Sequence, residues 1–157
     1  MTTSISQSKQ YLIRLLFLLL ITYGTGFFIM AFLQTPEQMQ WYDTLFHSSL
    51  TPPAVVFAIA WTILYALIAI STAIVWNKAG RLLFFVQLLL QIIWSYTFFV
   101  AHSLWLGLAV LALLCGVVAM MTVTFFKHSK LSGLLLTPYF LWCLFAAYLN
   151  LISALLN

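Results

Sequence analysis

The chain has 157 residues, of which 65% are hydrophobic and 5% are charged, whereas roughly a quarter of the residues in an ordinary soluble domain are charged. This composition excludes a water-soluble fold. The net charge of +4 arises from six Lys and Arg residues against two acids. It therefore reflects a shortage of acids rather than a basic surface, and nothing indicates nucleic-acid binding.

Five apolar runs, each long enough to cross a bilayer, follow one another along the chain. A hydrocarbon core of about 30 Å takes roughly 20 apolar residues in a helix. The runs cover residues 11–33, 54–76, 82–101, 105–126 and 134–156. Backbone amides in lipid must be satisfied within the segment, and no alternating strand pattern is present. We predict an all-α integral membrane bundle of five transmembrane helices, forming a single domain over residues 1–157.

The connection between the first two spans is predicted to hold a short helix. Residues 35–38 (TPEQ) have the form of a capping box with proline at the first helical position. Trp41 and Tyr42 fall on one side of this helix, which suits an interfacial anchor or a gating lid equally well. Thr51, followed by two prolines, is expected to cap the second span.

The remaining connections are predicted to be short turns, and the basic residues predict an orientation. The turns are expected at residues 77–81, 102–103 and 127–133. All six Lys and Arg residues fall on one side of the predicted spans. The positive-inside rule then places the N-terminus in the cytoplasm and the first loop on the opposite face.

The spans offer little ionisable chemistry. No Asp or Glu lies inside a predicted span, and His47, His102 and His128 fall in loops or at span ends. Proton-coupled transport and acid–base catalysis need a positioned ionisable group. Cys115 and Cys143 have no metal-like spacing and are interpreted as packing residues. We assign no catalytic residue and no metal ligand, and we favour a non-enzymatic function.

Aromatic residues instead recur at helical spacing on three spans. Counting back from the outer span ends at about 1.5 Å per residue places Trp61, Trp94 and Leu149 at roughly 10 Å depth. Trp142 lies deeper on the fifth span, with the small Ala146 one turn away. Taken singly, each such residue is explained by helix packing. Together they predict an apolar, aromatic-lined small-molecule site with a few polar groups.

Three segments resemble the translocator protein family, also called tryptophan-rich sensory proteins or peripheral benzodiazepine receptors. They are TPPAVVFAIAWTILYAL from Thr51, QLLLQIIWSYTFF from Gln87, and LSGLLLTPYFLWCLFAAYLNLISALLN from Leu131. The resemblance covers nearly the whole chain. It implies a homodimeric five-helix membrane receptor that binds porphyrins, haem-like tetrapyrroles and benzodiazepine-site ligands in a pocket closed by the first loop. The ligand-binding residues so expected are Trp41, Pro52, Pro53, Trp61, Tyr65, Trp94, Phe99, Tyr139, Trp142, Ala146, Leu149 and Asn150.

The sequence departs from the family pattern at a few positions. Val55 stands where many members have another tryptophan, Gln91 where asparagine is usual, and Ser48 where a loop proline is common. Tyr148 is followed by no Lys or Arg, so the C-terminal cholesterol pattern of animal members is incomplete. These departures favour a bacterial-type member in the bacterial cell membrane.

Three functions remain open at this point. The leading hypothesis is a membrane receptor or carrier for porphyrins and other flat hydrophobic ligands, gated by the first loop. It requires no cofactor, and porphyrin or haem is the candidate ligand. The second is an enzyme that breaks down a bound porphyrin in a light- or oxygen-dependent reaction. The third is a non-enzymatic interaction protein whose groove receives a lipid or another membrane helix.

Overall fold

The computed structural model describes residues 2–157, with side chains from Ser6 onward, and within that range it is helical without strands. Five of the helices are long and apolar enough to cross a membrane. The predicted all-α bundle with a short helix in the first loop is therefore confirmed. The elements are α1 (Thr2–Phe28), η1 (Ile29–Leu33), α2 (Pro36–Asp43), α3 (Ala54–Ile74), α4 (Lys78–Ser95), η2 (Tyr96–Val100), α5 (Leu104–His128) and α6 (Lys130–Leu156), where η1 and η2 are π-helical.

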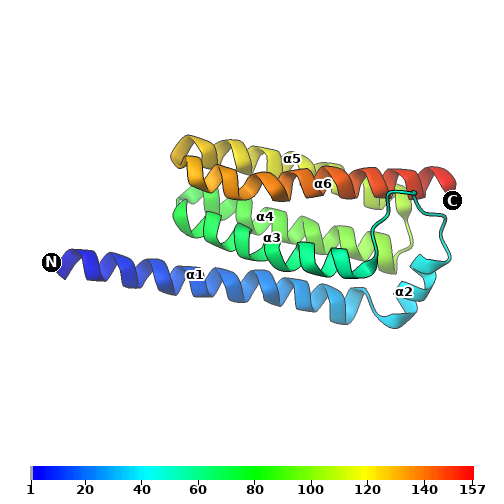
Figure 1. Cartoon of the computed structure of the whole chain (residues 1–157), viewed down its shortest axis with the longest axis horizontal. Coiled ribbons are helices and arrows are strands. Elements are labelled where there is room, and N and C mark those ends of the chain that lie inside the picture. Colours follow the sequence, from blue (N-terminus) through cyan, green and yellow to red (C-terminus); the bar gives the residue numbers. More distant parts are fainter. Residues whose placement is uncertain (1) are drawn as a thin grey trace.

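The long helices pack around a shared core in the order α1, α3, α6, α5, α4. The first turns of α1 extend past the ends of the other helices, and α2 lies at the opposite end of the bundle, beside the C-terminus (Figure 1). Leu18, Ile68, Phe84, Val118 and Leu136 are fully buried where the helices meet. Large apolar side chains also cover the outer faces of the bundle, as expected of a surface that contacts lipid rather than water.

The connection between α3 and α4 is shorter than predicted. α4 begins at Lys78 because Asn77 is its N-cap, with Oδ1 accepting from the backbone N–H of Gly80 at 2.7 Å. A capping side chain satisfies an amide that the first helical turn leaves free. The prediction of a turn over residues 77–81 is therefore wrong beyond Asn77, since Gly80 and Arg81 already lie in the helix.

The connection between α5 and α6 is reduced to a single residue. α5 ends at His128 and α6 begins at Lys130, so the predicted turn over residues 127–133 is also wrong. Ser129 joins the helices, and its hydroxyl oxygen accepts from the backbone N–H of Ser132 at 3.3 Å. The turn at residues 102–103 is confirmed.

The starts of α2 and α3 differ in how they are capped. Thr35 is the N-cap of α2, as predicted, but its hydroxyl hydrogen-bonds the side chain of Gln38 instead of a helix amide. The N-cap of α3 is Pro53, without a side-chain capping bond, so the prediction that Thr51 caps this helix is wrong. The backbone N–H of Thr51 instead donates to the carbonyl of Ser48 at 2.9 Å, within the loop.

Candidate functional site

An aromatic group forms where α3 meets α6 and α1. Trp61 and Tyr65, one turn apart on α3, stack with ring centroids 5.4 Å apart and an interplanar angle of 28°. The fully buried Tyr139 of α6 meets Trp61 edge-on, with centroids 6.3 Å apart. From α1, Gly26 faces the Tyr65 ring so closely that a Cβ there would lie 2.4 Å from it. Glycine is required at this position because α1 approaches α3 through the space that a side chain would fill.

The aromatic contacts between α3 and α6 also include Trp142, farther along α6. Its ring meets Phe57 of α3 edge-on, with centroids 5.7 Å apart, and lies 5.7 Å from Phe145 of its own helix. Trp142 and Ala146 are both half-buried. α3 and α6 thus meet through two groups of aromatic rings, one around Trp61 and one around Trp142.

A polar pair links α4 to α6 at the outer end of the bundle. Trp94 Nε1–H donates to Asn150 Oδ1 at 3.2 Å, and Asn150 Nδ2–H donates to the carbonyl of Leu104 at 2.9 Å. Asn150 is 2% exposed, so both groups of its amide are satisfied within the protein. Its predicted role as a polar contact for a ligand requires this pair to open.

The buried face of α4 carries polar groups that have no partner. Gln87, Gln91 and Ser95 follow one another at a spacing of four residues and are at most 1% exposed. Tyr139 Oη–H donates to Gln87 Oε1 at 2.7 Å, whereas Gln87 Nε2, both amide atoms of Gln91 and Ser95 Oγ form no hydrogen bond. Unpaired polar atoms inside an apolar bundle are costly. This face is therefore able to bind the polar groups of a guest molecule or internal water.

A lid (residues 34–53, including α2) lies over η2 at the same end. Trp41 stacks on His102, with ring centroids 4.0 Å apart and planes within 9°, and meets Phe98 edge-on at 5.9 Å. Tyr42 lies 6.1 Å from Phe98 and 5.8 Å from Phe99. Those two rings also lie 5.9 and 6.2 Å from Trp94. The lid is thus joined to the Trp94–Asn150 pair through the adjacent phenylalanines of η2.

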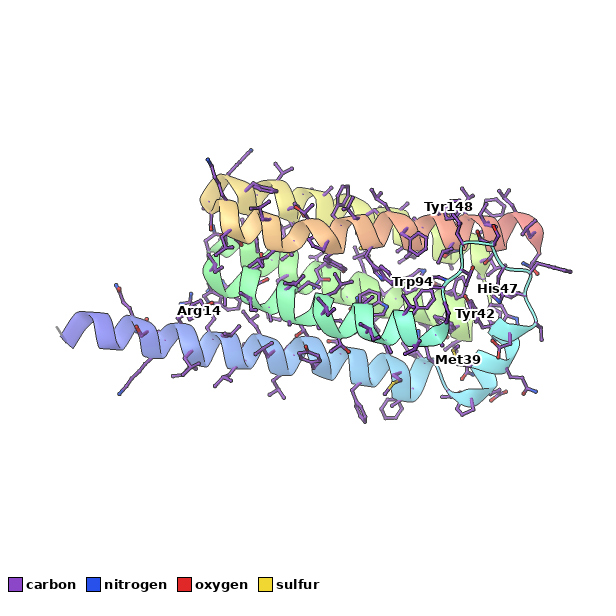
Figure 2. All side chains as sticks on the ribbon, in the orientation of Figure 1. Arg14, Met39, Tyr42, His47, Trp94 and Tyr148 are labelled. Carbon is purple, nitrogen blue, oxygen red and sulfur yellow. The ribbon has the colours of Figure 1, made fainter. Side chains whose placement is uncertain are left out.

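The loop after α2 is attached to α6. The backbone N–H of Phe46 donates to Asn157 Oδ1 at 3.0 Å, and Asn157 Nδ2–H donates to the Phe46 carbonyl at 3.2 Å. The hydroxyls of Ser48 and Tyr148 lie 3.2 Å apart, and Figure 2 shows Tyr148 above the lid residue Tyr42. These hydrogen bonds hold the lid over the ends of the helices.

Burial also changes the titration of Tyr42 in the lid. It raises the pKa of the Tyr42 hydroxyl above its ordinary value of 10.0, and the neighbouring carboxylate of Asp43 raises it further. Both causes disfavour the tyrosinate. Tyr42 therefore remains neutral, and able to pack on η2, to a higher pH than an exposed tyrosine.

Two hollows in the structure lie away from this aromatic region. One, of about 360 Å³, is at the opposite end of the bundle, beneath the α3–α4 turn. The other, of about 250 Å³, is on the outer face of α3 around Thr62. The aromatic rings of the candidate site are packed against one another, so a guest molecule must separate them.

Comparison with known proteins places this arrangement in a family. The model of the TspO/MBR family matches residues 17–155. The chain belongs to the TspO/MBR family. Among its relatives are the tryptophan-rich protein TspO of Archaeoglobus fulgidus, 37% identical with 91% of this chain and 94% of the relative covered, and that of Bacillus cereus, 35% identical with 83% and 88% covered. The human translocator protein is 32% identical, with 73% of each chain covered. Family membership and the five apolar helices together make the chain an integral multi-pass membrane protein.

The structure brings most of the residues predicted from the TspO/MBR resemblance to one end of the bundle. Ring contacts or hydrogen bonds connect Trp61 with Tyr65 and Tyr139, Trp94 with Phe99 and Asn150, and Trp41 with η2. Leu149 is buried beside Asn150 in the sequence of α6. Pro52 and Pro53 precede α3 at the rim and are half-buried and exposed, respectively.

Two residues of this candidate site, His102 and Phe98, are absent from the ligand-binding residues predicted from the sequence, although Phe98 shares a helical stripe with Trp94. His102 is the stacking partner of Trp41, and its backbone has a φ of 51° in the left-handed region. Phe98 contacts both lid aromatics because the π-helical turn of η2 buries it next to Phe99. His102 was marked as a turn residue, but nothing in its spacing relates it to a tryptophan 61 positions earlier.

Proposed function

We propose that this chain binds porphyrins and other flat hydrophobic ligands in the outer half of the bundle, between α3, α4 and α6 and beneath the lid. The observation that carries the proposal is the combination of stacking surfaces with unsatisfied polar groups. Trp61 and Tyr65 offer indole and phenol faces, and Gln91 offers a donor and an acceptor that nothing in the protein occupies. A planar ligand with polar edges complements both features.

The connection between these two features runs through Tyr139. Its ring contacts Trp61, and its hydroxyl binds Gln87, one turn from Gln91 on the same face of α4. The aromatic and polar surfaces therefore belong to one interior region. A ligand inserted there would replace ring–ring contacts with ring–ligand contacts and would pair the amide of Gln91. This exchange supplies binding energy without a charged residue.

The test is a titration of protoporphyrin into the purified protein in detergent, followed by quenching of tryptophan fluorescence. Trp61→Leu removes a stacking surface while keeping apolar volume, and Gln91→Leu removes the unpaired amide. Trp105→Leu is the matched control, since Trp105 is 59% exposed at the start of α5. Loss of a stacking face or of a buried hydrogen bond costs about 1–2 kcal/mol, which is roughly a tenfold weaker affinity.

Gln91→Leu separates ligand binding from fold stability. Removing an unpaired buried amide is expected to leave the melting temperature unchanged or raised, while the affinity for protoporphyrin falls. If Trp61→Leu and Gln91→Leu bind protoporphyrin as tightly as the Trp105→Leu control, the proposed site is wrong. Mass spectrometry of the recovered ligand tests the function class, because a receptor or carrier returns protoporphyrin unchanged whereas a degrading enzyme does not.

We also infer the orientation of the chain in a bacterial cell membrane. The six basic residues lie at the end of the bundle away from the lid, in α1, around the α3–α4 turn and around the α5–α6 turn. The positive-inside rule then supports a cytoplasmic basic end and a lid on the opposite face. Labelling of single cysteines in intact cells tests this. A cysteine at Gln40 should react with an impermeant reagent, and one at Lys127 should not.

A further inference from the structure

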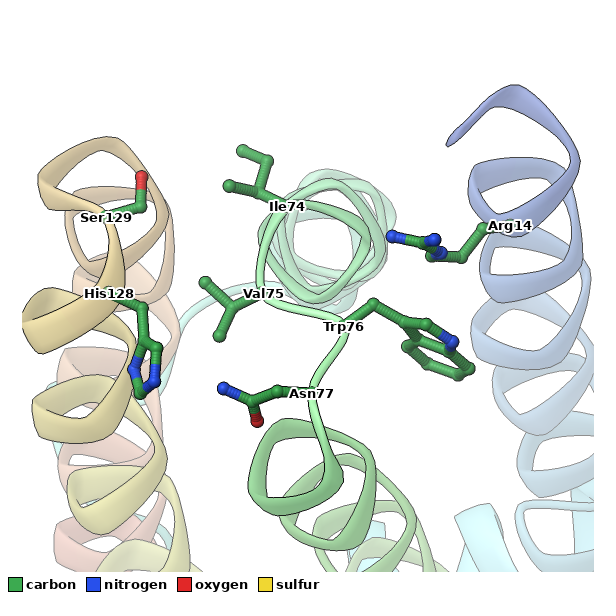
Figure 3. A pocket seen from close by; sticks show the side chains of 7 residues that line it. All are labelled: Arg14, Ile74, Val75, Trp76, Asn77, His128 and Ser129. Atoms are coloured by element: carbon green, nitrogen blue, oxygen red, sulfur yellow. The ribbon is translucent and has the colours of Figure 1, made fainter. Parts of the chain in front are cut away.

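The hollow at the basic end of the bundle is built from three separate parts of the chain. Figure 3 shows it around the α3–α4 turn, with Arg14 of α1 on one side and His128 of α5 on the other. The rest of its lining is Ile74, Val75, Trp76, Asn77 and Ser129. Its volume of about 360 Å³ falls in the range of roughly 300–1,000 Å³ typical of small-molecule clefts. The hollow is separate from the aromatic site beneath the lid.

Hydrogen-bond donors in this hollow are free to bind an anion. Asn77 Oδ1 is occupied as the cap of α4, so the amide nitrogen remains, and Figure 3 shows it directed toward His128. His128 Nδ1 lies 2.8 Å from the carbonyl of Thr124 and donates to it, so Nε2 of the neutral ring is an acceptor and offers no N–H to an anion. One guanidinium nitrogen of Arg14 donates to the carbonyl of Ala73 at 3.2 Å. Because a guanidinium carries five N–H groups, Arg14 retains further donors.

The electrostatics of this end favour a negatively charged guest. Arg14 and Arg81 both lie against the ring of Trp76, with guanidinium carbons 5.8 and 5.7 Å from its centroid. Both guanidinium groups thus add positive charge at this end of the bundle, which attracts an anion. The two acidic residues of the chain, Glu37 and Asp43, both lie in α2 at the other end. No carboxylate side chain of this protein is placed to neutralise the pair.

The N-termini of two helices add positive electrostatic potential to the hollow. α4 begins after Asn77 and α6 begins after Ser129, and both of these residues line the hollow. The partial positive charge of a helix N-terminus favours anions. The C-termini of α3 and α5 also lie here, but the Arg14 guanidinium donates to the Ala73 carbonyl of α3, and the His128 ring donates to the Thr124 carbonyl of α5. The balance of charge and donors in the hollow is therefore positive.

We propose that this hollow is a binding site for a phosphate-ester anion, held by Arg14 and Asn77. Its place at the ends of the apolar helices puts it at the level of the membrane surface, where basic pockets between transmembrane helices bind anionic lipid headgroups. A soluble phosphate offers the same chemistry. The two sources share the phosphate group and differ in whether acyl chains accompany it.

The experiment compares three variants that each lower the net charge by one unit. Arg14→Gln removes the guanidinium, and Asn77→Asp keeps an N-cap for α4 but replaces the free amide donor with a carboxylate. Lys127→Gln is the matched control, since Lys127 is exposed at the same end without lining the hollow. The full chain is studied in nanodiscs, and its melting temperature without added ligand confirms that each variant is folded.

Two probes distinguish the sources. In nanodiscs of phosphatidylcholine with a minor share of phosphatidylglycerol, native mass spectrometry measures how much phosphatidylglycerol stays bound. In pure phosphatidylcholine nanodiscs, the rise in melting temperature with added inorganic phosphate measures binding of the free anion. For at least one probe, Arg14→Gln and Asn77→Asp are expected to weaken binding by about tenfold, while Lys127→Gln matches the unaltered chain.

The outcomes then decide the proposal. The expected pattern with phosphatidylglycerol alone identifies a lipid headgroup as the ligand, and the same pattern with inorganic phosphate identifies a soluble phosphate. If Lys127→Gln weakens binding as much as the other two variants, the affinity is a diffuse effect of charge and the proposal is overturned. It is equally overturned if neither probe separates Asn77→Asp from the unaltered chain, because that variant remains capped and folded.

Discussion

Replacing Tyr139 with phenylalanine tests how the buried polar face of α4 is stabilised. The substitution removes the hydroxyl that donates to Gln87 Oε1 at 2.7 Å and leaves the ring in place. Tyr139 and Gln87 are both 0% exposed, so no water replaces the lost bond at the surface. Because Gln87 Nε2 is already unpaired, the whole amide of Gln87 loses its partners in this variant.

The expected loss of stability depends on how many hydrogen-bond partners the amide of Gln87 lacks, which is one in the unaltered chain and two in Tyr139→Phe. Hydrogen bonds inside membrane proteins contribute about 0.6 kcal/mol on average and at most about 1.7 kcal/mol, and an abandoned buried acceptor costs about 1–3 kcal/mol. We expect Tyr139→Phe to lower the free energy of unfolding by about 1–2 kcal/mol. Gln87→Leu removes the amide itself and is expected to be close to neutral. The double variant should then regain about 1 kcal/mol relative to Tyr139→Phe.

The two cysteines provide the assay. Cys115 and Cys143 are free and buried, so a thiol-reactive fluorogenic dye reports unfolding as the protein is heated in detergent. The expected order of melting temperatures places Tyr139→Phe lowest and the other three proteins close together. If the double variant unfolds as early as Tyr139→Phe, the two positions do not interact as the geometry requires, and the reasoning is refuted.

Three further predictions use the same purified protein. Gly26→Ala should destabilise the fold by about 1–3 kcal/mol, because the added Cβ would lie 2.4 Å from the Tyr65 ring. Gly24→Ala is the control and should not destabilise the fold, since the space around Gly24 is open. Equal melting temperatures of the two variants would contradict the contact. Asn157→Ala removes the two hydrogen bonds between Asn157 and Phe46 of the lid and should speed amide hydrogen exchange in the lid by about tenfold. Unchanged exchange would show that these hydrogen bonds do not hold the lid. Because the pKa of Tyr42 is raised in the folded protein, its packing is fully stabilising below pH 10.0, the ordinary tyrosine pKa, and is lost as the pH rises through the higher folded-state pKa. The late-titrating part of the tyrosinate absorbance should therefore shrink by one residue in Tyr42→Phe.

The sequence was sufficient to predict the helices but not all of their ends. Long apolar runs specify membrane-crossing helices almost by length alone. The starts of α4 and α6 lie earlier than the apolar runs because Asn77 and Ser129 cap them, which lets polar residues enter the first turn. The spacing of four residues between Trp61 and Tyr65 indicates one face of a helix, and their rings do stack.

The contacts between helices could not be predicted in the same way. The pairing of Trp94 with Asn150 joins positions 56 residues apart, and that of Gln87 with Tyr139 joins positions 52 residues apart. Periodicity assigns a residue to a face, but the partner of that face depends on how the helices are arranged around the core. The absence of hydrogen-bond partners around Gln91 is likewise a property of the assembled bundle.

The π-helical turn at the end of α4 has a consequence for comparing and engineering related chains. A π turn closes its hydrogen bonds over five residues instead of four, so η2 (Tyr96–Val100) accommodates one residue more than an α-helix of the same rise. Excising a single residue from this segment would restore ordinary α-helical winding, and the residues beyond the cut would keep their places because the wider turn only absorbs the extra residue. Phe98 and Phe99 could then no longer face α2 together. A chain aligned with a one-residue gap here should consequently carry a differently shaped floor under its lid, even where every tryptophan is retained.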